Sequence, residues 1–261
     1  MTTMTRHATG MFCWPQLTTT DLEGAKRFYS GLFGWKTEEN RVEGSTITLV
    51  KKADKIVGAV MADAQSGPPS WIDFVCVDSA DEIANRVKKS GGTVLIEPRD
   101  ASTNGRMAVF QDPTTAVFAV WQPGTKPGAD VVNEASTMCW NELITTDGAK
   151  ATTFYKSLFG WTDETAKGIN GPYTLLKKDG AMAAGLMQAT PEMKLTRPYW
   201  LIYFAVDDCD ASAAKAQQLS GKVMMKPTDI PDVGRFAVIT DPQGAWFAIM
   251  QPKSPQQTRR A

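Results

Sequence analysis

Histidine is almost missing from this sequence, with one residue, His7, among 261. Cysteine is also scarce, and the four cysteines, which are Cys13, Cys76, Cys139 and Cys209, show no CxxC spacing. Zinc sites and disulfide frameworks need clustered cysteines or histidines, so neither is expected. We interpret the cysteines as small buried residues.

An excess of charge of either sign is absent too. Lys plus Arg and Asp plus Glu both number 28, and no basic run stands out, so a nucleic-acid partner is not expected. No apolar segment approaches the roughly 20 residues that span a bilayer, which argues against a membrane partner. The first residues lack both the apolar stretch and the cleavage site of a signal peptide, so the cytoplasm is the expected compartment.

What the sequence does contain is an internal repeat. The segment Cys13–Asp21 recurs as Cys139–Asp147, and the shift of 126 continues without a gap as far as Trp35 and Trp161. From position 13 to position 35, 13 of 23 residues are identical between the copies. Farther along the shift becomes 129, so the second copy carries three extra residues in its middle loop. The chain is therefore a tandem duplication.

The repeat predicts a domain organisation. We expect a flexible N-terminus over residues 1–9, a first domain over 10–123, a linker over 124–135, a second domain over 136–252 and a flexible tail over 253–261. Glycine and proline in the segment from Gly124 to Asp130 favour a connection in extended form.

Each copy shows the same order of secondary-structure signals. In the first copy a strand is expected at 11–19, followed by a helix with its apolar face at Ala25, Phe28, Tyr29, Leu32 and Phe33. Thr20 to Glu23 resembles a capping box, and Gly34 is a plausible stop. Further strands are expected at 45–52, 56–62 and 71–77, then a helix to Val87, then strands at 93–97, 107–111 and 117–122. The fold class is α+β, with a strand–helix–strands unit occurring four times in the chain.

These motifs carry a family resemblance. The pattern Asp-x-x-x-Ala-x-x-Phe-Tyr-x-x-Leu-Phe-Gly-Trp, then Val-Asp, then Gly-Arg-x-Ala and Asp-Pro resembles the vicinal oxygen chelate superfamily of glyoxalases, bleomycin-resistance proteins and dioxygenases. The resemblance spans nearly the whole chain. It implies four βαβββ modules that form curved mixed sheets around cup-shaped cavities.

The resemblance also implies where metal ligands would stand. In metal-using members, a His or Gln precedes the helix-starting Asp by seven residues, a His opens the strand before Val-Asp, and a Glu follows Asp-Pro. In this sequence these positions hold Trp14, Ile72 and Ala119 in the first copy and Trp140, Leu201 and Ala248 in the second. Divalent metals need carboxylate, imidazole or thiolate donors, so we expect no metal and no other cofactor.

Strand alternation predicts what lines the cups instead. Inward-facing positions in the first cup are Trp14, Gln16, Ile72, Phe74, Ala119 and Trp121, and those in the second are Trp140, Glu142, Leu201, Tyr203, Ala248 and Met250. An aromatic, mostly apolar lining with one or two polar groups suits an aromatic or cationic organic ligand. Alternatively, these side chains fill the cups as additional core.

The two copies differ where a function would show. Gln16 is replaced by Glu142, and Phe74 by Tyr203, so the second cup alone has an ionisable group with a phenol. A carboxyl between Trp140 and Leu201 is expected to have a raised pKa, as a general base or a cation anchor; a backbone-bonded structural role is the alternative. Tyr173 and Tyr199, which we expect in loops near this cup, are candidate gates.

Arg106 and Arg235 stand at matched positions after a turn glycine. Each could clamp an anionic ligand, but ion pairs with Asp100 and Asp229 are the stronger expectation.

Three functions remain open from the sequence. The first is a metal-independent small-molecule binder of the sequestration or resistance type. The second is a lyase, isomerase or hydrolase in which Glu142 and Tyr203 are catalytic, and the third is a scaffold for an oligomer such as a homodimer. The sequence does not name the ligand, because aromatic walls accept many planar or cationic compounds.

Overall fold

The computed structural model describes residues 3–42, 45–63, 67–168 and 171–253. In the first copy the elements are β1 (Phe12–Thr19), α1 (Leu22–Phe33), β2 (Lys36–Val42), β3 (Ser45–Lys52), β4 (Lys55–Ala62), β5 (Ser70–Cys76), α2 (Ala80–Lys89), β6 (Thr93–Asp100), β7 (Gly105–Gln111) and β8 (Val117–Pro123). In the second copy they are β9 (Met138–Thr145), α3 (Gly148–Phe159), β10 (Thr162–Gly168), β11 (Gly171–Lys178), β12 (Ala181–Gln188), the 3-10 turn η1 (Pro191–Met193), β13 (Tyr199–Ala205), α4 (Cys209–Gln218), β14 (Lys222–Ile230), β15 (Gly234–Thr240) and β16 (Trp246–Pro252).

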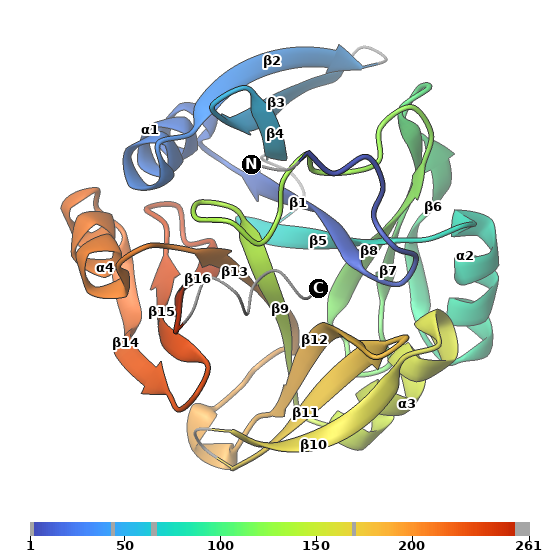
Figure 1. The fold of residues 1–261 in the computed structure, drawn as a ribbon. Helices are drawn as coiled ribbons and strands as arrows, with labels where there is room; N and C mark the ends of the chain where they lie inside the picture. The colour runs from blue at the N-terminus through green and yellow to red at the C-terminus, as the bar shows by residue number, and fades with distance from the viewer. Residues whose placement is uncertain (1–2, 43–44, 64–66, 169–170, 254–261) are drawn as a thin grey trace.

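Each copy builds one mixed, curved sheet of eight strands (Figure 1). The order is β2-β3-β4-β1-β5-β8-β7-β6 in the first sheet and β10-β11-β12-β9-β13-β16-β15-β14 in the second. In the first sheet, β1 and β5 lie antiparallel at the centre, with β4 parallel to β1 and β8 parallel to β5. Two βαβββ modules of the same copy therefore meet in each sheet. The predicted fold is confirmed, and module pairing stays within a copy.

The first helix shows how the sequence sets these elements. Its N-cap is Asp21, whose side chain accepts a hydrogen bond from the backbone N–H of Gly24, so the cap lies one residue after the predicted Thr20. Gly34 ends the helix in the left-handed conformation with φ of 71°, as the stop signal predicts. The predicted apolar face is buried against the sheet.

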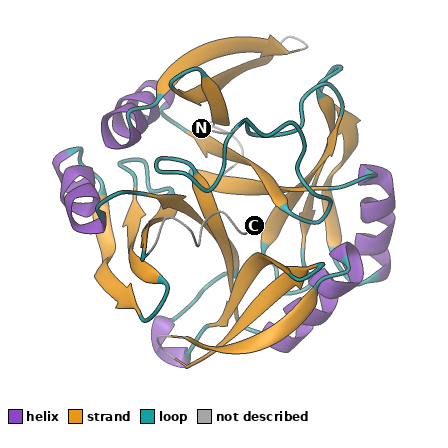
Figure 2. Ribbon diagram, viewed as in Figure 1, coloured by secondary structure: helices purple, strands orange, loops and turns teal. Residues whose placement is uncertain are grey.

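The helix-covered faces of both sheets share one apolar core. Helix α1 packs against α4 of the other copy, and α2 packs against α3, so the four α-helices form two pairs on opposite sides of the strands (Figures 1 and 2). Strand β13 also contacts β5, which brings the centres of the two sheets together. Each domain therefore completes the core of the other.

Two matched hydrogen-bond chains cross between the copies within this core. The indole of Trp71 donates to the hydroxyl of Tyr29 at 2.9 Å, and Tyr29 donates to the Asp241 carboxylate at 3.1 Å. The second chain repeats the first with the copies exchanged: Trp200 donates to Tyr155 at 2.9 Å, and Tyr155 donates to Asp112 at 2.9 Å. The aspartates are those of the two Asp-Pro motifs, which therefore serve as interdomain acceptors.

The segment before the first domain is packed rather than loose. His7 is 3% exposed, and its Nε2 atom lies 2.9 Å from the carbonyl oxygen of Ala129. The backbone N–H of Met4 donates to the carbonyl of Asp130 at 2.7 Å. Burial of the imidazole and backbone pairing therefore attach these residues of the expected flexible N-terminus to the segment 129–130. Of the predicted flexible ends, residues 1–2 and 254–261 lie outside the described residues.

The linker is held against the first domain as well. The backbone N–H of Ala129 donates to the carbonyl of Cys13 at 2.8 Å, and that of Asp130 donates to the carbonyl of Ile56 at 2.7 Å. Within the part of the chain that the structure describes, no helix is both long and apolar enough to cross a bilayer.

Candidate functional site

The face of each sheet that is turned away from the shared core has its own apolar cluster. In the first copy the cluster contains the predicted residues Trp14, Ile72, Phe74, Ala119 and Trp121. Gln16 belongs to the same row, and its side-chain N–H group lies 3.1 Å from the sulfur of Met61. The structure therefore brings the six predicted residues of the first cup onto one face.

The second copy assembles its predicted residues in the same way. Trp140, Leu201, Tyr203, Ala248 and Met250 belong to one cluster. In the strand register Trp140 lies opposite Tyr203, Glu142 lies opposite Leu201, and Tyr203 lies beside Ala248. Glu142 is 9% exposed in the middle of this face. The face is packed by its own side chains, and we refer to it as the Glu142 site.

Hydrogen bonds organise the polar centre of the Glu142 site. The hydroxyl of Tyr203 donates to Oε2 of Glu142 at 3.0 Å. The indole of Trp140 donates to the hydroxyl of Tyr173 at 3.1 Å, and this hydroxyl lies near enough to the Glu142 carboxyl to lower its pKa. One phenol therefore donates to a carboxyl that is walled by apolar side chains, and a second phenol lies beside it.

Tyr173 is the residue near Glu142 whose position the sequence did not predict correctly. It lies within β11 and not in a loop, and Tyr199 likewise begins β13. Because β11 pairs with β12 and β12 pairs with β9, Tyr173 reaches Glu142 across an intervening strand. Alignment of the two copies at the shift of 126 could have identified Tyr173 as a site residue, because the first copy has Ile47 at the equivalent position.

Burial dominates the electrostatics of the site. It raises the pKa of Glu142, and the hydrogen bonds from Tyr173 and Tyr203 offset part of this shift. Burial and then the neighbouring Glu142 charge raise the pKa of Tyr203 and of Tyr173 well above the ordinary tyrosine value. The two phenols therefore keep their protons and act as donors to the carboxyl across the physiological pH range.

Four coordinated differences between the copies build this polar centre. Glu142 replaces Gln16, Tyr203 replaces Phe74, Tyr173 replaces Ile47 and Gly185 replaces Ala59, whereas Trp140 and Trp14 match. The strand register confirms that Ala59 and Gly185 are equivalent, since Gln16 lies beside Ala59 and Glu142 lies beside Gly185. A shared fold does not require such replacements, because the first copy folds without them.

The metal positions of the resemblance offer no donors. Trp140, Leu201 and Ala248 present indole, aliphatic and methyl groups to the second concave face, and none of these binds a divalent cation. Among the described residues, no group of three or more His, Cys, Asp or Glu side chains gathers in a way that could hold a metal ion. The residues at these positions therefore do not fit the metal of the wider family.

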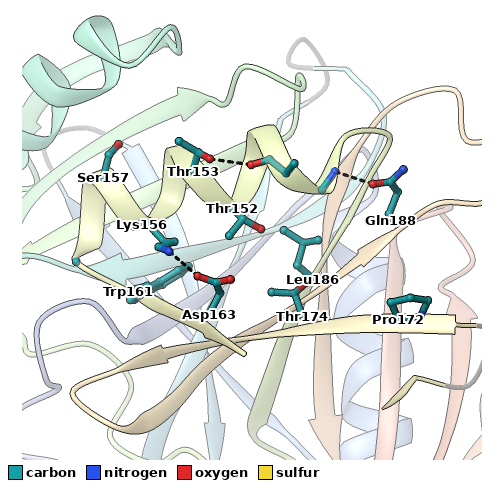
Figure 3. Close-up of a pocket in the computed structure, with 13 residues that line it drawn as sticks. Thr152, Thr153, Lys156, Ser157, Trp161, Asp163, Pro172, Thr174, Leu186 and Gln188 are labelled. Carbon is teal, nitrogen blue, oxygen red and sulfur yellow. Dashed lines mark hydrogen bonds and ion pairs between the residues drawn. The ribbon is translucent and has the colours of Figure 1, made fainter. Parts of the chain in front are cut away.

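A separate surface hollow of about 760 Å³ lies between α3 and strands β10 to β12 (Figure 3). Its walls include Thr152, Lys156, Thr174, Leu186 and Gln188. Leu186 and its neighbours face the shared core, whereas Tyr173 and Gly185 face the Glu142 site. The hollow is therefore on the other side of the sheet, and it contains none of the predicted site residues.

The two matched arginines are structural, as expected. Arg106 pairs with Asp100 at 2.9 Å and with Asp81 at 2.8 Å. Arg235 pairs with Asp229 at 3.1 Å and makes a bidentate ion pair with the Asp210 carboxylate. Each guanidinium joins its strand to the first turn of the helix that precedes it in the same module.

Comparison with known proteins agrees with this geometry. The profile of the Glyoxalase/Bleomycin resistance protein/Dioxygenase superfamily matches residues 7–120 and 135–249. The chain belongs to this superfamily. A relative from Mycobacterium tuberculosis (strain CDC 1551 / Oshkosh), named "Putative glyoxylase CFP32", is 42% identical over 253 residues, which cover 94% of this chain and 95% of the relative. The "Anthracycline biosynthesis protein DnrV" of Streptomyces peucetius is 35% identical over 269 residues, with 95% of each chain covered.

Solved structures share the fold at low sequence identity. The Mn(II)-bound glyoxalase from Novosphingobium aromaticivorans is similar with a TM-score of 0.66 at 15% identity, covering 93% of this chain and 82% of the other. The 2,2',3-trihydroxybiphenyl 1,2-dioxygenase from Sphingomonas wittichii strain RW1 also gives 0.66 at 14% identity, covering 94% and 91%.

Proposed function

We propose that the Glu142 site binds a small organic ligand that has an aromatic body and a hydrogen-bond donor, without a resident metal ion. The observation that carries the proposal is the position of the Glu142 carboxyl. It is buried in an aromatic face, it accepts a hydrogen bond from the hydroxyl of Tyr203, and the hydroxyl of Tyr173 lies beside it.

A ligand can donate a hydrogen bond to the Glu142 carboxyl in place of a phenol. Because a buried carboxyl without donors costs free energy, the phenols of Tyr203 and Tyr173 stabilise it when the site holds no ligand. A phenol or amine of a ligand offers the same donor, and Trp140 offers an aromatic surface beside it. Tyr173 is therefore the side chain that we expect to move when a ligand enters.

The relatives support an aromatic ligand in particular. DnrV is named as an anthracycline biosynthesis protein, and an anthracycline contains a planar, hydroxylated ring system. A ligand of this class combines the flat body and the hydroxyl donors that the Glu142 site would recognise.

Dihydroxyanthraquinone is a suitable probe because its own absorbance reports binding. We expect Trp140→Ala to weaken its binding at least tenfold, since the aromatic wall is lost. Trp14→Ala is the matched control in the first copy and should leave the affinity almost unchanged. If Trp14→Ala removes binding and Trp140→Ala does not, the ligand occupies the other cup.

A second candidate function is metal-independent catalysis with Glu142 as general base. It is favoured by the raised pKa of Glu142, because general bases act best when their pKa lies nearer to the working pH. Glu142→Gln separates the two candidates. As an anchor, Glu142 contributes about 1.5–3 kcal/mol of binding free energy, which Gln would lose. As a base, its loss lowers turnover by roughly a hundredfold or more while binding persists.

A further inference from the structure

Two aromatic side chains at the edge of the second concave face have no part in the hydrogen bonds around Glu142. Tyr199 begins β13 and Trp246 begins β16. Their ring centroids are 6.3 Å apart, with the planes inclined by 53°. Trp246 is 42% exposed, although it is a large apolar side chain, and Tyr199 is half-buried. Part of the indole ring therefore faces solvent beside Tyr199.

This pair stands on the same face as the Glu142 site. Alternation along β13 places Tyr199 with Leu201 and Tyr203, and Tyr199 packs against their cluster. Alternation along β16 places Trp246 on the face of Ala248. Since Ala248 lies beside Tyr203 in a parallel pair, Trp246 falls beside Leu201, which is opposite Glu142.

The distance from the pair to the carboxyl is short. Tyr199 lies two residues from Leu201, which is about 7 Å along a strand. Burial and the neighbouring Glu142 charge raise the pKa of Tyr199 to about 12, so the phenol is within the electrostatic reach of the carboxyl. Trp246, Tyr199 and Glu142 therefore border one continuous strip of the concave face.

The first copy lacks this feature. At the equivalent positions, with the shift of 129, Ser70 stands for Tyr199 and Val117 stands for Trp246. The fold is built without either aromatic side chain in that copy, so neither is needed to hold the strands. The aromatic pair occurs in the same copy as Glu142, Tyr173 and Tyr203, which links it to the ligand site rather than to the scaffold.

We infer that Tyr199 and Trp246 form a second aromatic station of the Glu142 site, so that the site takes a fused, planar polycyclic ligand in preference to a single-ring compound. The inference rests on the proposed function. One hydroxylated end of the ligand meets Glu142 and Trp140, and the far ring stacks on Trp246. A single-ring phenol reaches the carboxyl but not the station.

A series of planar phenols of increasing length tests this inference. Phenol, naphthol and dihydroxyanthraquinone are titrated into the full chain, and affinity is measured by calorimetry. Wild-type affinity should rise along the series. Trp246→Val and Tyr199→Ser install the residues of the first copy; each should weaken dihydroxyanthraquinone binding about tenfold and change phenol binding less than twofold. Trp246→Phe retains an aromatic ring and should keep most of the affinity.

The possible outcomes distinguish a failure of the second aromatic station from a failure of the proposed Glu142 site. If Trp246→Val changes all three affinities equally or changes none, while Glu142→Gln still weakens binding, the station is wrong and the Glu142 site stands. If none of the compounds binds the wild type, or if Glu142→Gln and Trp140→Ala have no effect, the proposed function fails and the station fails with it. An unchanged melting temperature of Trp246→Val, expected from the exposure of this indole, shows that the variant is folded.

Discussion

The hydroxyl oxygen of Tyr173 lies 1.7 Å from the point that a Cβ atom on Gly185 would occupy. No side chain can therefore stand at Gly185 while Tyr173 keeps its position. Gly185 lies beside Glu142 in the neighbouring strand, so the missing side chain is what gives the phenol access to the carboxyl. The contact is specific to the second copy, because Ala59 and Ile47 occupy the equivalent positions in the first.

Gly185→Ala should displace the Tyr173 hydroxyl, remove the hydrogen bond that it accepts from Trp140 and move the phenol away from Glu142. We expect the free energy of unfolding to fall by about 1–3 kcal/mol, because the indole loses its acceptor and the buried carboxyl loses a neighbouring hydroxyl. Chemical denaturation measures this change. In a Tyr173→Ile background the same substitution should cost much less, since it then reproduces the pair found in the first copy. Additive effects of the two substitutions would contradict the contact.

Glu142 should make stability depend on pH. Burial raises its pKa in the folded protein above the ordinary value of 4.5, so folding favours the protonated carboxyl. This contribution is complete below the unfolded-state pKa and is lost as the pH rises through the raised folded-state pKa. Glu142→Gln cannot titrate, so the stability of the wild type relative to this variant should decrease as the pH rises above the ordinary pKa of 4.5.

Urea denaturation of both proteins across this pH range provides the measurement. Asp73 and Asp241, whose pKa values burial also raises, titrate in both proteins and cancel in the difference. A difference that stays constant with pH would show that Glu142 has the same pKa in the folded and unfolded chain.

The hydrogen-bond chains between the copies should make the two domains unfold together. Tyr155→Phe leaves the Trp200 indole without its acceptor and Oδ2 of Asp112 without its donor, although Oδ1 of Asp112 keeps its hydrogen bonds from Thr114 and Ala116. We expect a cost of about 1–3 kcal/mol, mainly for the buried indole N–H left unpaired. Tyr29→Phe is its counterpart in the other chain and should cost a similar amount. Calorimetry should show one transition in the wild type and in both variants, at a lower temperature in the variants. Two resolved transitions in the wild type would refute the coupling.

A chelator should leave the melting temperature of the protein unchanged. The reason is the chemistry of Trp140, Leu201 and Ala248, which supply no ligands at the positions that bind metal in other members of the superfamily. Elemental analysis of purified protein is the direct check. About one zinc, nickel, iron or manganese ion per chain would mean that the chain holds its metal with a different set of residues.

The sequence predicted the architecture well because the repeat is itself a structural alignment. Trp14 and Trp140 occupy equivalent strands, with Phe74 and Tyr203 as their cross-strand partners. Period-two alternation then placed the cup residues on one face, since strands obey it locally. These successes share one property: they depend on neighbours in sequence or on neighbours in an expected strand pair.

The contacts that escaped prediction are non-local. Tyr173 reaches Glu142 across β12, and the space for it comes from a glycine that has no chemistry of its own. The pairing of Tyr29 with Asp241 joins residues 212 positions apart, in different domains. His7 is buried and contacts Ala129 of the linker, 122 positions away, which composition alone does not reveal.

The back-to-back packing of the two sheets has a consequence for how such a chain can evolve. Residues on the shared faces pack against both copies, so a substitution at Tyr29 or Tyr155 is expected to affect the stability of both domains. The apolar cluster on each concave face consists of residues of its own copy, so a substitution there is expected to leave the packing of the other copy unchanged. A duplicated gene of this design can therefore keep one half as a conservative copy while the other half acquires new side chains one by one. The glutamate, the tyrosines and the exposed indole of the second half have the distribution that such a history would leave.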